Sequence, residues 1–182
     1  ARTRRHELTV TSKYNMLPES DGFFLEIAQE LASEYPDVQM NHFIVDDFAC
    51  RLVANPRQFD VTVMPNLYGD ILSDAAAGLV GGLGLAASGC YGKDYAYFES
   101  AHGTAPDIVG RNIINPTANL LSAAMMLDYL GKGDKKYRAA HDAIMNAIDV
   151  VLREGPRTPD LGGSAKTADV GKAIAEALTG SS

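Results

Sequence analysis

Two aspartates, Asp70 and Asp74, stand four residues apart within the segment 66–84. On a helix this spacing places both carboxylates on one face, one turn apart. Two like charges so close repel each other unless a cation lies between them, and hard divalent cations prefer carboxylate oxygens. The preceding run 59–64 is strand-like, so the pair would begin a helix beyond the carboxyl end of a strand, where open α/β sheets bind ligands. Two aspartates at this spacing are usually a solvated helix face, so the spacing alone allows a divalent metal site, and the residues around the pair must favour it.

Composition limits the possible partners. The chain has 182 residues, 46% hydrophobic, and a formal net charge of −7, which suits one or two globular domains with a real core. The acidic balance argues against nucleic acid or an anionic membrane as the main partner, and no apolar run reaches the roughly 18–20 residues of a membrane span. Cys50 and Cys90 fit no metal or disulfide spacing and are expected to be buried thiols in a reducing compartment.

The basic start of the chain, residues 1–5, has no apolar stretch behind it and is not a secretory signal. The sequence begins without Met and reads as a strand almost at once, so we expect it to start inside a larger protein. Alternating strands and helices indicate α/β architecture. Strands are expected at 8–11, 38–45, 61–64 and 95–99, and helices at 21–35, 48–54, 70–79, 116–130, 135–153 and 167–178.

The whole string at 66–84, NLYGDILSDAAAGLVGGLG, resembles the signature of the β-decarboxylating dehydrogenases, the family of isocitrate, 3-isopropylmalate, homoisocitrate and tartrate dehydrogenases. The resemblance runs from about residue 10 to 178 and covers roughly the second half of a family member. It implies the isocitrate/isopropylmalate dehydrogenase-like α/β fold, which is not the usual Rossmann fold and would here be incomplete. Residues 1–81 would be part of the small dimerisation and metal-site domain, and residues 82–182 the C-terminal part of the large cofactor-binding domain.

This resemblance assigns roles to five polar residues. Lys13 and Asn15 match a lysine and an asparagine that contact substrate. In the family, the lysine transfers a proton both when the enol forms after decarboxylation and when that enol is protonated. Asp46 matches a catalytic, metal-binding aspartate that joins Asp70 and Asp74 around Mg²⁺ or Mn²⁺. In the family, the lysine and the first aspartate act in the neighbouring subunit's site, which implies a homodimer with shared active sites.

The residues alone leave other interpretations of these positions open. A lysine after a strand is commonly a surface lysine, and an Asp-Asp pair before a helix is commonly an N-cap. We expect Asp47 to cap the helix while Asp46 turns to the metal. The helices at 48–54 and 70–79 match the family's dimer interface, so self-association is expected.

A second motif, ESAHGTAPDI at 99–108 followed by Asn115-Pro116-Thr117, resembles the family's adenosine-binding loop. Members that use NADP carry lysine and tyrosine where this chain has Asp107-Ile108. An acidic side chain accepts hydrogen bonds from the ribose 2′-hydroxyl and repels a 2′-phosphate, so the motif predicts NAD. The resemblance places along the cofactor the residues His102, Gly103, Thr104, Ala105, Asp107 and Ile108, with Asn115 bonding the adenine. The glycines at 81, 82 and 84 would serve either tight turns and packing or cofactor contact.

The implied activity is NAD-dependent, Mg-assisted oxidative decarboxylation of a small-molecule 2-hydroxy-3-carboxy acid. Isocitrate, giving 2-oxoglutarate, is favoured because residues 20–26 and 64–70 look more like NAD-dependent isocitrate dehydrogenases. The alternatives are 3-isopropylmalate, homoisocitrate or tartrate dehydrogenase, or a non-catalytic regulatory subunit. The carboxylate-clamping arginines and the catalytic tyrosine of the family would lie outside this chain, so the chain alone is expected to be inactive. The expected compartment is the cytoplasm, or the mitochondrial matrix in a eukaryote.

Overall fold

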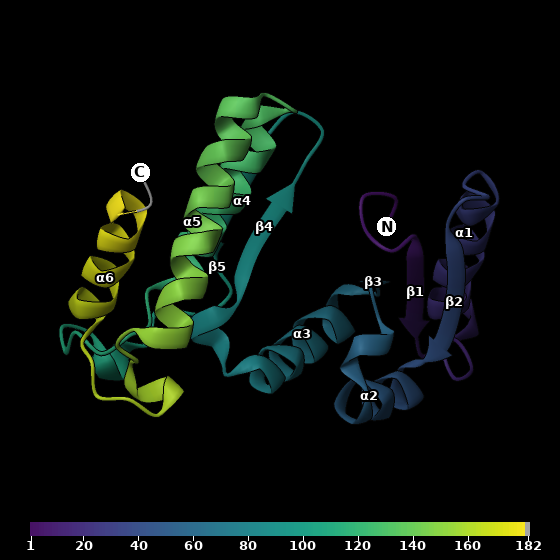
Figure 1. The fold of residues 1–182 in the computed structure, drawn as a ribbon. Helices are drawn as coiled ribbons and strands as arrows, with labels where there is room; N and C mark the ends of the chain where they lie inside the picture. The colour runs from purple at the N-terminus through teal and green to yellow at the C-terminus, as the bar shows by residue number, and fades with distance from the viewer. Residues whose placement is uncertain (181–182) are drawn as a thin grey trace. The chain divides into compact units, whose positions relative to one another are not determined.

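The computed structural model describes residues 1–180, and the chain divides into two compact units, Ala1–Leu79 and a second unit that starts at Val80. The first contains a parallel sheet covered by helices, and the second a hairpin covered by helices (Figure 1). The architecture is α/β, as the alternation of elements predicts. Among the described residues, every helix is too short or too polar to cross a membrane.

The sheet of the first unit has the strand order β2-β1-β3, with β1 at Glu7–Ser12, β2 at Gln39–Ile44 and β3 at Val61–Val63. Both neighbours of β1 run parallel to it, with Glu7 opposite Gln39 and Leu8 opposite Val61. A central parallel strand is buried on both faces, and residues Thr9 through Ser12 are all buried. The helices of this unit are α1 (Phe23–Ser33), α2 (Val45–Ala54) and α3 (Asn66–Val80), with a π-helical turn η1 (Pro18–Gly22) and a 3₁₀ turn η2 (Pro56–Gln58).

The second unit is built on the antiparallel pair β4 (Ala87–Tyr91) and β5 (Ala96–Ser100). Its helices are α4 (Thr117–Gly131), α5 (Lys135–Glu154) and α6 (Thr167–Gly180), with 3₁₀ turns η3 (Leu83–Leu85), η4 (Pro106–Ile108) and η5 (Pro159–Leu161). Helix α4 lies against the hairpin because the facing residues are small. Ala118 and Ala124 are fully buried, and the Ser122 hydroxyl donates to the Glu99 carbonyl at 2.6 Å.

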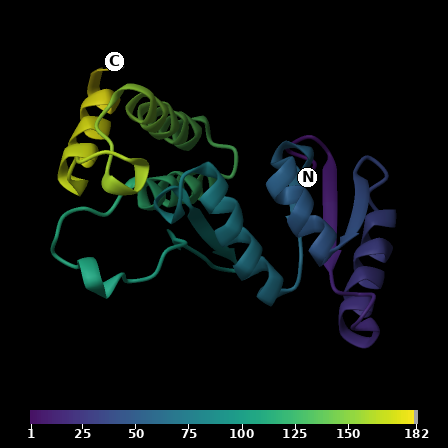
Figure 2. The ribbon, with the colours of Figure 1, turned by 90° about the horizontal axis from the view of Figure 1, so that it is seen from below.

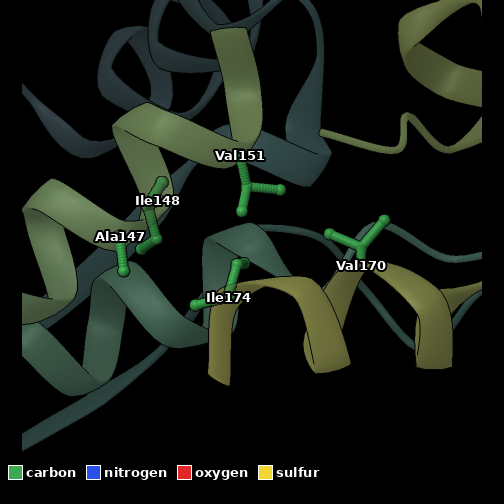
Figure 3. Close-up of a cluster of buried hydrophobic side chains, with 5 residues drawn as sticks. All are labelled: Ala147, Ile148, Val151, Val170 and Ile174. Atoms are coloured by element: carbon green, nitrogen blue, oxygen red, sulfur yellow. The ribbon is translucent and has the colours of Figure 1, made fainter. Parts of the chain in front are cut away.

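The core of the second unit lies between α5 and α6. Ile148 and Val151 of α5 face Val170 and Ile174 of α6 in Figure 3, and all four side chains are at most 5% exposed. Partly buried leucines of α4, Leu120 and Leu121, pack against this cluster. The segment 101–116 leaves this body as a long loop with the single turn η4 (Figure 2).

Three local expectations are wrong. Helix α2 begins at Val45 and its N-cap is Ile44, so Asp47 does not cap it and pairs instead with Arg51 one turn on, at 2.8 Å. Cys50 and Cys90 are exposed, because one lies on a surface of α2 and the other on a hairpin too small to bury both faces. Strand β4 falls in the glycine-containing stretch after α3, where no strand was expected.

Candidate functional site

One edge of the three-stranded sheet collects the polar residues that the sequence singles out. Because the strands are parallel, their carboxyl ends lie at the same edge. Lys13 directly follows β1, Asp46 is the second residue of α2 after β2, and α3 with its two aspartates follows β3. The topology therefore brings together elements that are about 30 to 60 residues apart in the chain.

Lys13 and Asp46 form an ion pair across this edge. The Nζ of Lys13 lies 2.5 Å from Oδ1 of Asp46, with the lysine side chain 30% exposed and the aspartate side chain 69% exposed. The hydrogen bond from the Lys13 ammonium group lowers the pKa of the Asp46 carboxyl below its usual 3.8. At neutral pH Asp46 is therefore a charged carboxylate paired with the Lys13 side chain, at the rim of the sheet and open to solvent.

Asp70 and Asp74 lie on the exposed side of α3, as the spacing predicts. The helix begins at Asn66, four residues earlier than expected, so the pair lies one turn inside it. Few groups around them balance the two negative charges. The Asn66 side-chain amide donates to Asp70 at 3.5 Å, and within residues 1–180 no ion pair neutralises either carboxylate. Two unneutralised oxygen ligands on one helix face fit part of the set that Mg²⁺ or Mn²⁺ requires.

A complete metal site is not assembled within the described part of one chain. No three His, Cys, Asp or Glu residues among positions 1–180 are grouped closely enough to hold a metal ion. Asp46 is bound to Lys13 and does not join the α3 pair in such a group. A single copy thus offers two carboxylates in one place and a lysine–carboxylate pair in another.

The second unit presents the other predicted motif as an exposed loop. Asp107 is exposed in η4, and Ile108, at the end of that turn, is half-buried. The preceding Ala105 has φ +46°, a left-handed conformation that costs a non-glycine residue energy and is often found at functional sites. Half-buried His102 interacts through Nδ1 with the Gly103 carbonyl oxygen at 2.9 Å. Thr104, which lies between Gly103 and Ala105, is exposed.

Asn115 is the anchor of this loop rather than an open binding group. It is 3% exposed, its Oδ1 accepts from the Thr117 backbone N–H at 3.0 Å, and its Nδ2 donates to Asp160 at 3.1 Å. The contact of Asn115 with adenine stays a prediction. The second hydrogen of its amide group would have to make that contact. Sequence reasoning missed Asp160, since an aspartate in a loop 45 residues away carries no local signal of this pairing.

The glycines before β4 have structural reasons of their own. Gly81 and Gly82 have φ values of +123° and +120°, which side chains rarely allow. A Cβ on Gly84 would lie 2.6 Å from Oδ2 of Asp160 and 2.8 Å from Cβ of Asn115. Gly84 therefore serves close packing against the loop anchor, which is one of the two alternatives that the sequence leaves open.

Two adjoining cavities of about 530 and 410 Å³ lie beside this loop. They share five lining residues, namely His102, Ile108, Ile113, Ile114 and Asn115. Their volumes are in the range of small-molecule sites. Three of the residues predicted to bind the cofactor thus line a cavity that the fold forms by itself, and Gly103 and Ala105 line the smaller one.

The first unit thus places a lysine–carboxylate pair and two exposed aspartates on elements that follow the carboxyl ends of its parallel strands, and the second unit has a loop cavity of its own. The family model described as isocitrate/isopropylmalate dehydrogenase matches residues 1–174. The chain belongs to this family, as its signature at 66–84 indicates.

Individual relatives agree with this membership. The chain is 53% identical over 174 residues to an isocitrate/homoisocitrate dehydrogenase of Thermus thermophilus, covering 96% of this chain and 51% of the relative. It is 48% identical over 176 residues to a mitochondrial NAD isocitrate dehydrogenase catalytic subunit of Arabidopsis thaliana, covering 96% and 46%. Among solved structures, isocitrate dehydrogenase from Methylococcus capsulatus superposes with a TM-score of 0.91 at 45% identity, covering 97% and 52%. The chain thus spans about half the length of the relatives it matches.

Proposed function

We propose that this chain supplies the metal ligands, the proton-transfer group and the cofactor loop of an NAD-dependent oxidative decarboxylase of a 2-hydroxy-3-carboxy acid. The observation that carries the proposal is the Lys13–Asp46 pair at the sheet edge from which the aspartate-bearing α3 also starts. The substrate favoured is isocitrate, in line with the names of the Thermus and Arabidopsis relatives. The Thermus name also includes homoisocitrate, and the family name includes isopropylmalate, so these are the competing substrates.

The residues would divide the chemistry as follows. When bound, the divalent metal acts as a Lewis acid on the substrate oxygens and NAD⁺ accepts the hydride. Asp70 and Asp74 of one copy and Asp46 of another would hold the metal. Lys13 would hold a proton at Nζ and give it to the carbon that loses carbon dioxide, while Asn15 orients the substrate.

The cofactor loop supports NAD over NADP. Asp107 is exposed in a turn, and within residues 1–180 no ion pair occupies its carboxylate, so it is free to accept from ribose hydroxyls. It would also repel a 2′-phosphate. His102, Gly103 and Ala105 would lie along the cofactor in the cavity that they line.

We propose that activity depends on assembly. The chain covers about half of its relatives, and we propose that residues 1–182 alone do not turn over substrate. The active form would be a homodimer with shared sites, bringing α2 and α3 of two copies together. Exposed apolar side chains on these helices support this contact: Val53 on α2, and Leu67, Ile71 and Leu79 on α3. The compartment would be the cytoplasm, or the mitochondrion as the Arabidopsis name states for that relative.

The test is NADH formation by the full-length gene product that contains these residues, with NAD⁺, Mg²⁺ and four hydroxy acids in parallel: isocitrate, homoisocitrate, 3-isopropylmalate and tartrate. We expect turnover with isocitrate, and Asp70→Asn should reduce it by about 100-fold or more because it removes a metal ligand. Asp149→Asn, a matched exposed helix aspartate in the second unit, should leave it unchanged. NAD⁺ binding without turnover of any acid would support the regulatory subunit instead, and full activity of Asp70→Asn would refute the metal assignment.

A further inference from the structure

A buried carboxylate, Asp21, lies directly behind the lysine–carboxylate pair and has no part in the chemistry proposed above. Asp21 belongs to the turn η1 and is 7% exposed. Its Oδ2 accepts from the backbone N–H of Lys13 at 2.7 Å, and its Oδ1 accepts from the Ser20 hydroxyl at 3.3 Å. Burial and a hydrogen bond to Asp21 raise the pKa of the Tyr68 hydroxyl on α3.

The groups that donate hydrogen bonds to Asp21 carry no charge. This determines which role its carboxylate can have. Burying a charge is costly unless hydrogen bonds compensate it, and a backbone N–H bonded to a carboxylate is among the stronger compensations. Asp21 therefore does not balance a buried cation. Its side-chain oxygens hold the Lys13 backbone N–H and the Ser20 hydroxyl in place.

Lys13 is held on both sides of its Cα atom. Its N–H is bound by Asp21, and its carbonyl accepts from the backbone N–H groups of Met16 and Leu17, both at 2.9 Å. The preceding Ser12 is completely buried and donates its hydroxyl to the Asp21 carbonyl at 3.3 Å. With the main chain fixed in this way, the direction in which the Lys13 side chain leaves the sheet edge is restricted.

The same carboxylate connects two elements that carry site residues. Lys13 directly follows β1, and Tyr68 lies in the first turn of α3, two residues before Asp70. We propose that Asp21 is a positioning residue, which fixes the Lys13 backbone so that Nζ reaches its working place. This inference rests on the proposed function.

Three variants of the full-length gene product test this role. Asp21→Ala removes both side-chain acceptor oxygens, and Asp21→Asn keeps the volume and one acceptor oxygen but loses the charge. Ser20→Ala is the matched control, since it removes a neighbouring donor and leaves the Lys13 and Tyr68 contacts intact. We expect Asp21→Ala to lower kcat by about 100-fold, the cost of a misplaced group, with the KM for NAD⁺ within about twofold of the parent. Asp21→Asn should recover about a tenth of the parent kcat, and Ser20→Ala should match the parent.

A merely structural role would reduce the amount of folded protein without changing kcat per folded site, so the rate is normalised to folded protein. Should Asp21→Ala fail to fold, Asp21→Asn decides, because an unchanged kcat in that variant overturns the inference. The second readout is the Lys13 backbone amide by ¹⁵N NMR. Its exchange protection should fall in both Asp21 variants and persist in Ser20→Ala.

The two readouts separate this inference from the proposed function. If the parent protein turns over none of the acids but the Lys13 amide still depends on Asp21, the proposed function fails while the structural link to Lys13 stands. If the parent is active and both Asp21 variants keep its kcat, the positioning role is refuted.

Discussion

At the residue scale, the Lys13–Asp46 pair is better explained by chemistry than by stability. Both side chains reach solvent, and exposed ion pairs contribute little to the free energy of unfolding. Because the pKa of Asp46 is lowered, its negative charge persists through the neutral range, and only acid below that pKa would release the lysine. The charged Asp46 carboxylate therefore keeps the Lys13 side chain beside it through the neutral range.

Asp107 allows a residue-scale prediction on cofactor choice. Changing Asp107→Asn removes the charge that would repel a 2′-phosphate, so the ratio of NADP to NAD⁺ affinity should rise about tenfold or more. Equilibrium binding of the two cofactors, followed by fluorescence, measures this without turnover. Asp94→Asn, an exposed aspartate outside the loop in the same unit, is the control and should keep the parent ratio. An unchanged ratio in Asp107→Asn would place the discrimination elsewhere.

At the element scale, hydrophobic periodicity located most helices and strands, because each has one face toward a core. Hydrophobic periodicity failed where packing against a neighbouring cluster or pairing with another strand determines the element. Helix α2 begins three residues early because Val45 packs against the buried cluster around Phe48, and β4 forms in a glycine-containing stretch because it pairs with β5. The motif residues could be named from their order along the chain, and their roles stay predictions. Asp160 could not be found in this way, since its role depends on a contact with Asn115, 45 residues away. The hydrogen bond of Asp21 to the Lys13 backbone likewise leaves no signal in the sequence.

A substitution at Gly84 tests whether η3 and the cofactor loop pack against each other as one element. Gly84→Ala would place a Cβ 2.8 Å from Cβ of Asn115, whose side chain is held at both ends and cannot move aside. We expect a loss of about 1–3 kcal/mol in the free energy of unfolding, measured by denaturant titration. Gly171→Ala in α6 meets nothing within 4 Å and should instead stabilise by up to about 1 kcal/mol. Equal effects of the two substitutions would contradict the packing.

At the scale of the whole molecule, we propose that two copies of the chain build each site. One copy gathers no three-residue metal site within residues 1–180, while α2 and α3 leave apolar side chains in solvent, such as Val53 at 64% and Ile71 at 59% exposure. Unpaired apolar surface next to incomplete ligand sets is what a shared interface would require.

The most direct test mixes two inactive variants of the full-length protein, Lys13→Met and Asp70→Asn, after unfolding and joint refolding. In a mixed dimer with shared sites, one site receives the intact lysine of one copy and the intact aspartate of the other. Half of the dimers are mixed and each has one complete site, so about a quarter of the parental activity should return. A mixture that stays as inactive as either variant alone would show that one chain supplies both residues to the same site, or that no such dimer forms. Either result would contradict sites shared between two copies.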